Sequence, residues 1–204
     1  MVHIITPKYN GFCSGVKRCI KLTEKLLLEN KTVYALGNLL HNDQEMTRLK
    51  ELGLIVLNNR SEIKDNSTVV IQTHGVEKNI FNELKNKKID ICDGTCPIVK
   101  KSQRIVSKYS DAGYNVIIYG DVKHPEIKAL LSYINPKVKT ILINSVEEIK
   151  NVSIPEKEKI ILIAQTTKEV KQYKNIASKL KYKFNTIKVF DTICKETVIR
   201  ELDT

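Results

Sequence analysis

The sequence contains no tryptophan, four phenylalanines and five arginines, although lysine and arginine together number 34 of its 204 residues. Proteins that bind single-stranded nucleic acid stack bases on aromatic side chains, and this chain has few to offer. Its net charge of +11 comes almost wholly from lysines that are spread along the chain rather than clustered. A lysine-rich nucleic-acid-binding module is therefore the least favoured of three interpretations, and we expect no nucleic-acid partner.

Long apolar runs are also missing. No stretch approaches the roughly 18 apolar residues that cross a bilayer, so we expect no membrane partner. The first 12 residues lack the apolar core and cleavage site of a signal peptide. We expect the chain in the cytoplasm, or in the interior of a plastid-like organelle if its source is eukaryotic. There its five cysteines stay reduced, which favours metal binding or catalysis over disulfides.

The chain repeats itself at a fixed offset, and each repeat contains a cysteine. Three pairs of residues share an offset of 83: Cys13 and Cys96, Gly37 and Gly120, and His41 and His124. A second echo, at an offset of 93, relates Gln72-Thr73 to Gln165-Thr166, each pair closing an apolar run. A further cysteine, Cys194, opens a third segment. Self-similarity at a fixed period indicates structural units of one kind, each of which delivers a cysteine to a common place.

Short apolar runs alternate with stretches of helical period, which is typical of α/β proteins with parallel sheets covered by helices. We predict buried strands at residues 3–6, 33–36, 54–57, 68–72, 89–92, 115–119, 140–143, 159–164 and 186–189. The repeat divides the chain into a unit at 14–96, a unit at 97–193, and a remnant of a third unit made of 1–13 plus 194–204. The third unit is largely missing, because only eleven residues run from Cys194 to the last residue.

Cys13, Cys96 and Cys194 come from three different units and could converge at their common centre. Thiolates select soft metals, and an iron–sulfur cluster is the usual product of several converging cysteines. Three protein ligands, rather than four, leave one iron open to a substrate. The remaining cysteines, Cys19 on a helix face and Cys92 at a strand end, are interpreted as small buried apolar residues.

Three of the four histidines, namely His41, His74 and His124, follow strands and precede helices. Imidazole groups beside helix N-termini suit a phosphate or diphosphate, and Thr166 adds a hydroxyl donor in one of these turns. Taken singly, each histidine is more typical of a surface or packing residue, but as a set they favour binding. His3, inside the first predicted strand, is assigned to structure.

Glu126 lies two residues beyond His124, where a helix is predicted to begin. A carboxylate in the first turn can simply complement the helix dipole. Beside an anionic substrate and a cluster it can instead relay a proton. The spacing alone favours neither role.

Taken together, seven motifs resemble the 4-hydroxy-3-methylbut-2-enyl diphosphate reductase family, in family order over essentially the whole chain. The motifs are Gly11-Phe12-Cys13-Ser14-Gly15-Val16, Leu40-His41-Asn42, Thr73-His74-Gly75-Val76, Asp93-Gly94-Thr95-Cys96-Pro97, Gly120-Asp121-Val122-Lys123-His124-Pro125-Glu126, Gln165-Thr166-Thr167 and Thr192-Ile193-Cys194.

The resemblance implies a trefoil of pseudo-threefold related α/β units around a [4Fe–4S] cluster held by Cys13, Cys96 and Cys194. It implies that His41, His74 and His124 contact the substrate diphosphate. It also implies that Glu126 donates a proton together with Thr166, near the allylic hydroxyl.

The reaction that the resemblance implies is a two-electron reductive dehydroxylation to isopentenyl and dimethylallyl diphosphates, with ferredoxin or flavodoxin as electron donor. The leading hypothesis is a reductase of this family in truncated form. The alternative is a non-catalytic remnant that binds a cluster or a diphosphate without turnover.

Overall fold

The computed structural model describes residues 6, 8–29, 31–87 and 89–203, and the chain divides into two compact units. We call Cys13–Lys100 the amino-terminal unit, and we call Lys101–Thr204 together with Met1–Phe12 the carboxyl-terminal unit. The boundary predicted after residue 96, and the third unit predicted from 1–13 plus 194–204, stay predictions.

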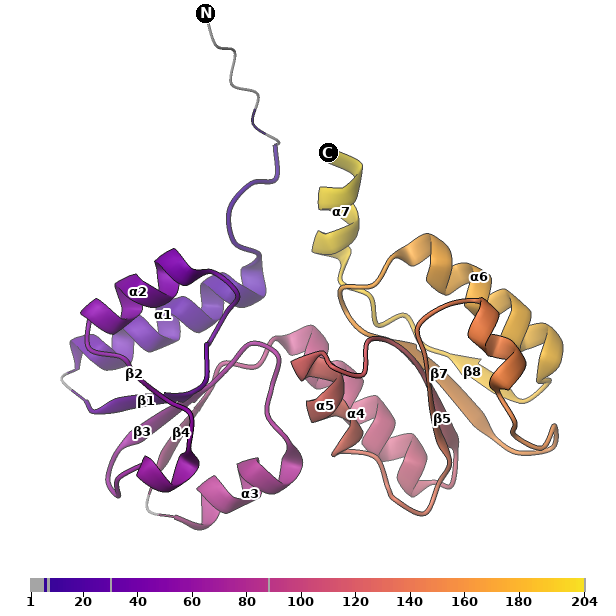
Figure 1. The fold of residues 1–204 in the computed structure, drawn as a ribbon, viewed down its shortest axis with the longest axis horizontal. Coiled ribbons are helices and arrows are strands. Elements are labelled where there is room, and N and C mark those ends of the chain that lie inside the picture. Colours follow the sequence, from indigo (N-terminus) through magenta and orange to yellow (C-terminus); the bar gives the residue numbers. More distant parts are fainter. Residues whose placement is uncertain (1–5, 7, 30, 88, 204) are drawn as a thin grey trace, which may run out of the picture. The chain divides into compact units, whose positions relative to one another are not determined.

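The amino-terminal unit is one parallel sheet with helices on both faces. Its elements are α1 (Ser14–Leu28), β1 (Val33–Leu36), α2 (Asp43–Glu51), β2 (Ile55–Leu57), the 3-10 helix η1 (Arg60–Glu62), β3 (Thr68–Ile71), α3 (Lys78–Asn86) and β4 (Asp90–Asp93). The strand order is β2-β1-β3-β4, and every neighbouring pair is parallel. Helices α1 and α2 lie on one face of the sheet and α3 lies on the other (Figure 1).

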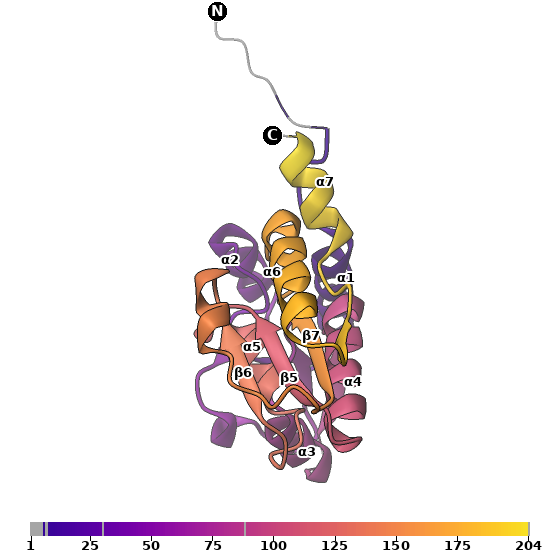
Figure 2. The ribbon, with the colours of Figure 1, turned by 90° about the vertical axis from the view of Figure 1, so that its right-hand side faces the viewer.

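The carboxyl-terminal unit has the same topology. Its elements are α4 (Pro97–Asp111), which begins before the division, β5 (Asn115–Tyr119), α5 (Pro125–Leu131), β6 (Thr140–Ile143), the 3-10 helix η2 (Glu147–Asn151), β7 (Ile160–Ala164), α6 (Val170–Lys183), β8 (Ile187–Val189) and α7 (Lys195–Asp203). The strand order is β6-β5-β7-β8, again parallel throughout. Figure 2 shows β6, β5 and β7 side by side, with α6 over one face.

The two central strands of the carboxyl-terminal unit are buried on both faces. Val116 and Ile118 of β5 pack in one apolar cluster with Val106 of α4, whereas Ile117 packs in the other with Ile176 of α6. Successive side chains of a strand point to opposite faces, so a strand covered on both sides reads as a continuous apolar run. This is why β5 and β7 are fully apolar at their centres and were predictable from sequence.

Helix α1 also follows the sequence prediction. Cys19, which the sequence places on a helix face, is buried there together with Ile20 and Thr23. Thr23 stays satisfied in the core because its hydroxyl donates to the carbonyl oxygen of Cys19 (2.9 Å). The hydroxyl group of a threonine inside a helix can bond one turn back in this way, which removes the cost of burying it.

Eight of the nine predicted strands are observed, with bounds that differ by at most one residue at either end. The ninth, at residues 3–6, lies outside the described residues except for Thr6, and so does His3. One feature of the prediction was wrong: β2, β4 and β8 are not buried strands, since no residue within any of them is fully buried. All three lie at the edge of a sheet, where a neighbouring strand covers them on one side only.

A search of the described residues finds no helix with the length and apolar character that a membrane span requires.

Candidate functional site

Each unit has one place where its strand order reverses, and four of the predicted site residues lie there. In the amino-terminal unit the chain moves outward from β1 to β2, then returns to β3 on the other side of β1. The loops that leave β1 and β3 therefore diverge, and open α/β sheets bind ligands in the crevice between such loops. His41 follows β1 and His74 follows β3. His124 and Thr166 follow β5 and β7, the equivalent strands of the carboxyl-terminal unit.

The thiols of Cys13 and Cys96 come together at Gly15. A Cβ atom placed on Gly15 would lie 2.9 Å from Sγ of Cys96 and 3.9 Å from Sγ of Cys13. Cys13 also caps α1, because the backbone N–H of Val16 donates to its sulfur (3.5 Å). Two sulfurs flank a space that a single methyl group would fill, at the N-terminus of a helix. This donor pair suits a soft metal, so the residues present fit an iron–sulfur group.

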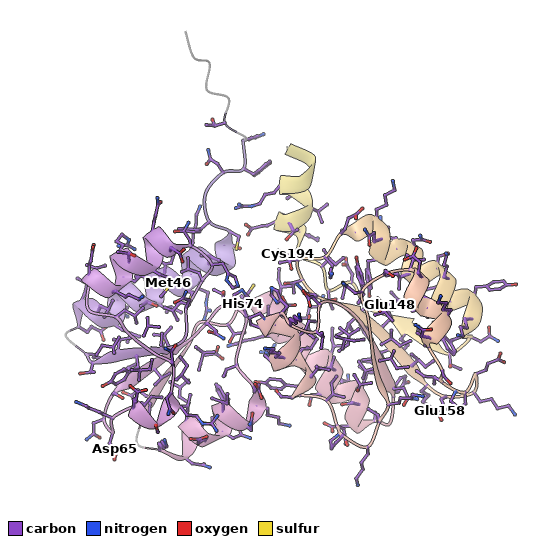
Figure 3. All side chains as sticks on the ribbon, in the orientation of Figure 1. Met46, Asp65, His74, Glu148, Glu158 and Cys194 are labelled. Atoms are coloured by element: carbon purple, nitrogen blue, oxygen red, sulfur yellow. The ribbon has the colours of Figure 1, made fainter. Side chains whose placement is uncertain are left out.

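Cys96 and Cys194 are anchored by the same backbone contact. The N–H of Cys96 donates to the carbonyl oxygen of Thr73 (2.9 Å), and the N–H of Cys194 donates to that of Thr166 (2.8 Å). A helix begins directly after each cysteine: α4 after Cys96 and α7 after Cys194. Figure 3 labels Cys194 where α7 begins. The repeat seen in the sequence is therefore a repeat of backbone geometry around each of these two cysteines.

The other two cysteines differ from these. Cys19 is fully buried, and burial together with the neighbouring Cys92 raises the pKa of its thiol to about 11. Burial also raises the pKa of Cys92, although this residue is only partly buried. Metals bind the thiolate, and both thiols resist its formation. The prediction of a buried structural cysteine is confirmed for Cys19, whereas Cys92 is less buried than predicted because it lies on the edge strand β4.

His41 and His74 form a ring pair in the amino-terminal unit. Their ring centroids lie 4.6 Å apart and the planes are tilted by 43°. The two loops are tied together next to this pair, because the hydroxyl of Thr73 donates to the carbonyl oxygen of Leu39 (3.2 Å). The loops after β1 and β3 thus present two imidazoles at one place, as the strand order predicts (His74 is labelled in Figure 3).

His124 has a structural role in addition to any binding role. It is the N-cap of α5, and its Nδ1 accepts a hydrogen bond from the backbone N–H of Glu126 (3.2 Å). In the neutral ring this places the proton on Nε2, which is the atom that can donate to a ligand. The capping contact fixes which nitrogen of His124 carries the proton.

Glu126 and Thr166 form a buried pair. Glu126 is 2% exposed, and its two carboxylate oxygens accept from the backbone N–H (2.8 Å) and the hydroxyl (2.7 Å) of Thr166. Burial raises the pKa of Glu126, and the two hydrogen bonds from Thr166 oppose that shift. The carboxyl group therefore holds its proton to a higher pH than an exposed glutamate does. This environment suits a proton donor better than a surface partner of the helix dipole.

The sequence prediction assigned no role to Gly15 and Gly94, although both belong to the motifs that carried the resemblance. Gly94 has no space for a side chain: a Cβ atom there would lie 2.3 Å from the carbonyl oxygen of Ile71 and 2.7 Å from Sγ of Cys19. The available signal was proximity in sequence, since each glycine lies two residues from a predicted metal ligand. A glycine so close to a ligand often marks a close approach that a side chain would block.

Comparisons with known proteins point to one family. A family model described as LytB protein matches residues 4–204. The 4-hydroxy-3-methylbut-2-enyl diphosphate reductase of Campylobacter hominis is 42% identical over 194 residues, which cover 95% of this chain and 67% of the relative. That of Clostridioides difficile is 37% identical over 201 residues, covering 98% of this chain and 71% of the relative.

The chain belongs to the LytB family. It spans about two thirds of the length of the curated LytB relatives named above. A solved structure of (E)-4-hydroxy-3-methyl-but-2-enyl diphosphate reductase matches with a TM-score of 0.85 and 35% identity, covering all of this chain and 72% of that one. The reductase from Plasmodium falciparum matches with a TM-score of 0.87 and 28% identity, covering 94% of this chain and 61% of that one. The two four-stranded parallel sheets are thus a LytB fold.

Proposed function

We propose that this chain has the activity of its LytB relatives, the reduction of 4-hydroxy-3-methylbut-2-enyl diphosphate to isopentenyl and dimethylallyl diphosphates. The reaction breaks the allylic C–O bond and consumes two electrons and two protons. One proton leaves with the hydroxyl group as water, and the other is added to carbon. Ferredoxin or flavodoxin would supply the electrons.

One observation carries the proposal: Thr166 bonds both a proposed cluster ligand, Cys194, and the proposed proton donor, Glu126. Its carbonyl oxygen accepts from the N–H of Cys194, while its own N–H and hydroxyl donate to Glu126. A residue that anchors a proposed cluster ligand thus also orients a buried carboxyl group. An arrangement serving structure alone has no need to bury an ionisable group.

Cys13, Cys96 and Cys194 would hold a [4Fe–4S] cluster. The pair of thiols around Gly15 and the common anchoring of Cys96 and Cys194 support this ligand set. When bound, such a cluster supplies electron transfer and Lewis acidity. The resemblance also proposes a trefoil with a threefold centre for the complete family fold.

The chain's own residues would bind the substrate and move the proton. His41, His74 and His124 would donate to the diphosphate oxygens, each from a loop at a strand end. Thr166 would keep the carboxyl group of Glu126 in place through two hydrogen bonds. Glu126, with its raised pKa, would keep its proton to a higher pH than an exposed glutamate and deliver it at the allylic position.

The test is turnover by the full chain after anaerobic reconstitution with iron and sulfide. The chain is supplied with the allylic diphosphate and a low-potential reductant, and both isoprenoid diphosphate products are quantified by mass spectrometry. We expect both products from the wild type and none from Cys13→Ala. Binding of the substrate without any product, in a preparation that holds its cluster, would instead favour the non-catalytic alternative.

A further inference from the structure

A basic side chain holds the turn that leads into Cys96. Arg18 of α1 donates from Nη2 to the carbonyl oxygen of Asp93 (3.2 Å) and from Nη1 to that of Thr95 (3.4 Å). These two carbonyl groups flank Gly94, which rests on the sulfur of Cys19. Adjacent residues of α1, Arg18 and Cys19, therefore hold the turn by a charged hydrogen-bonding group and by packing. Arg18 is the fifth residue after Cys13.

The same relation recurs at the next cysteine. Lys101 is the fifth residue after Cys96, and its Nζ donates to the carbonyl oxygen of Asp191 (3.4 Å). Asp191 precedes Cys194 by three residues, just as Asp93 precedes Cys96 by three. A basic residue on the helix that follows one cysteine again contacts the turn that precedes the next.

The third cysteine shows a related contact. Arg200 of α7 is the sixth residue after Cys194, and its Nη1 donates to the carbonyl oxygen of Gly11 (2.7 Å). Gly11 precedes Cys13 by two residues. The three contacts therefore form a closed cycle along the chain. Each helix that follows one of the three cysteines contacts the segment that precedes a different one of them.

We propose that Arg18, Lys101 and Arg200 are positioning residues that hold the backbone in front of Cys96, Cys194 and Cys13. The inference rests on the proposed function only in taking these cysteines as cluster ligands. A lysine-rich surface makes other contacts to carbonyl groups, such as that of Lys183 with Val152 (2.7 Å). Chance contacts of that kind do not select the approach to a cysteine three times.

The physical reason for such contacts is that the turn before a cysteine sets where its thiol lies. The backbone N–H groups of Cys96 and Cys194 donate to threonine carbonyls, and their carbonyl oxygens accept from the helices that follow. A charged donor on a helix that bonds a carbonyl group of the preceding turn adds a restraint on that turn. Arginine presents a planar fork that reaches two carbonyl groups, whereas a lysine ammonium acts as a single point. Arg18 therefore restrains its turn more than Lys101 does.

The experiment measures thiol proximity in the full chain without its cluster. The anaerobic, reduced protein is treated with dibromobimane, and mass spectrometry quantifies the peptide bridged between Cys13 and Cys96. Because the guanidinium fork is lost, we expect Arg18→Met to slow bridging by about fivefold or more, with Arg18→Lys between it and the wild type. Lys17→Met, at an exposed neighbour on the same helix, is the matched control and should stay within about twofold of the wild type.

Amide hydrogen exchange tests the other two positions. We expect Lys101→Met to speed exchange at the amide of Cys194, and Arg200→Met to speed exchange in the segment that leads to Cys13. These two variants keep the proposal testable if Arg18→Met fails to fold, as judged by circular dichroism. Bridging and exchange at wild-type rates in folded variants would overturn the proposal.

Iron content of the reconstituted wild type separates this proposal from the proposed function. Slower bridging in Arg18→Met, in a protein that takes up no iron, would support the positioning role and contradict the cluster. Normal iron uptake with unchanged bridging would contradict the positioning role alone.

Discussion

Asp43 and Glu126 occupy equivalent positions in the two units, yet their surroundings are opposite. They are separated by the 83-residue offset of the repeat, and each lies in the first turn of a helix that follows the first strand of its unit. Asp43 is exposed, whereas Glu126 is buried and accepts two hydrogen bonds from Thr166. The same position thus complements a helix dipole in one unit and provides a buried acid in the other. A repeated scaffold can therefore bury an acid in only one of its copies.

The equivalent threonines explain how this difference arises. Thr73 and Thr166 share the 93-residue offset, and each offers its carbonyl oxygen to the N–H of a cysteine. The hydroxyl of Thr73 donates to the backbone carbonyl of Leu39, but that of Thr166 donates to the Glu126 carboxylate. The backbone role is common to both units because the topology dictates it. The side-chain role depends on whether a carboxylate turns inward.

We expect the largest effect on turnover, where substitutions of the two equivalent carboxylates should give very different rates. Glu126→Gln removes the proposed proton donor while keeping its shape, and we expect product formation to fall by about 100-fold to 10,000-fold. Asp43→Asn, at the equivalent exposed position, should change the rate by less than about twofold. Initial rates of the reconstituted chain measure both, and equal losses in the two variants would break the distinction between the units.

The next largest difference is expected between substitutions at two glycines, measured as the free energy of unfolding. Gly94→Ala places a Cβ atom against the backbone oxygen of Ile71, which cannot move aside, and we expect a loss of about 3 kcal/mol or more. In Gly120→Ala the close atom is Cδ1 of Ile127 (2.7 Å), the far end of a side chain that can rotate, so about 1–2 kcal/mol is expected. Urea titrations compare them, and a larger loss at Gly120 would contradict the steric account.

Substitutions at two equivalent helix positions outside the site should differ less in the free energy of unfolding. Arg48 of α2 bonds Glu45 and Glu24 but is 43% exposed, so Arg48→Ala should cost little stability. The residue 83 positions later is Leu131, which packs on the apolar cluster beneath α5, and Leu131→Ala should cost about 1–2 kcal/mol. The same urea titrations rank the two, and a costlier loss at Arg48 would show that its ion pairs matter more than apolar burial.

The smallest expected effect is on how the free energy of unfolding depends on pH. Because burial raises the pKa of Glu126 in the folded chain, its contribution to stability is fully present below the ordinary glutamate pKa and is lost as the pH rises through the folded value. Glu126→Gln abolishes this dependence, so its stability relative to the wild type should increase from acidic to neutral pH. Unfolding free energies measured across this pH range test the sign.

The strands could be predicted because they follow from apolar runs, whereas the contact between the rings of His41 and His74 depends on the strand order, which only the structure shows. The opposite surroundings of Asp43 and Glu126 could not, since both carboxylates hold the same place in the repeat. Inward rotation of Glu126 depends on its contact with Thr166, which is 40 residues away in sequence. Likewise, only three-dimensional packing shows that the thiols of Cys13 and Cys96 both lie next to Gly15. Local sequence predicts which side chains lie at the end of a strand, but contacts between residues far apart in sequence decide which of these side chains touch.

The central claim is that the units deliver their cysteines to one cluster, and iron content tests it most directly. After anaerobic reconstitution, iron, sulfide and the electron paramagnetic resonance of the reduced chain are measured for the wild type and for single Cys→Ala variants. We expect about four irons per wild-type chain, as a cubane cluster holds, and loss of that cluster in the Cys13, Cys96 and Cys194 variants but not in Cys92→Ala. An iron content that stays at the wild-type level in Cys194→Ala, or that falls in Cys92→Ala, would contradict the claim.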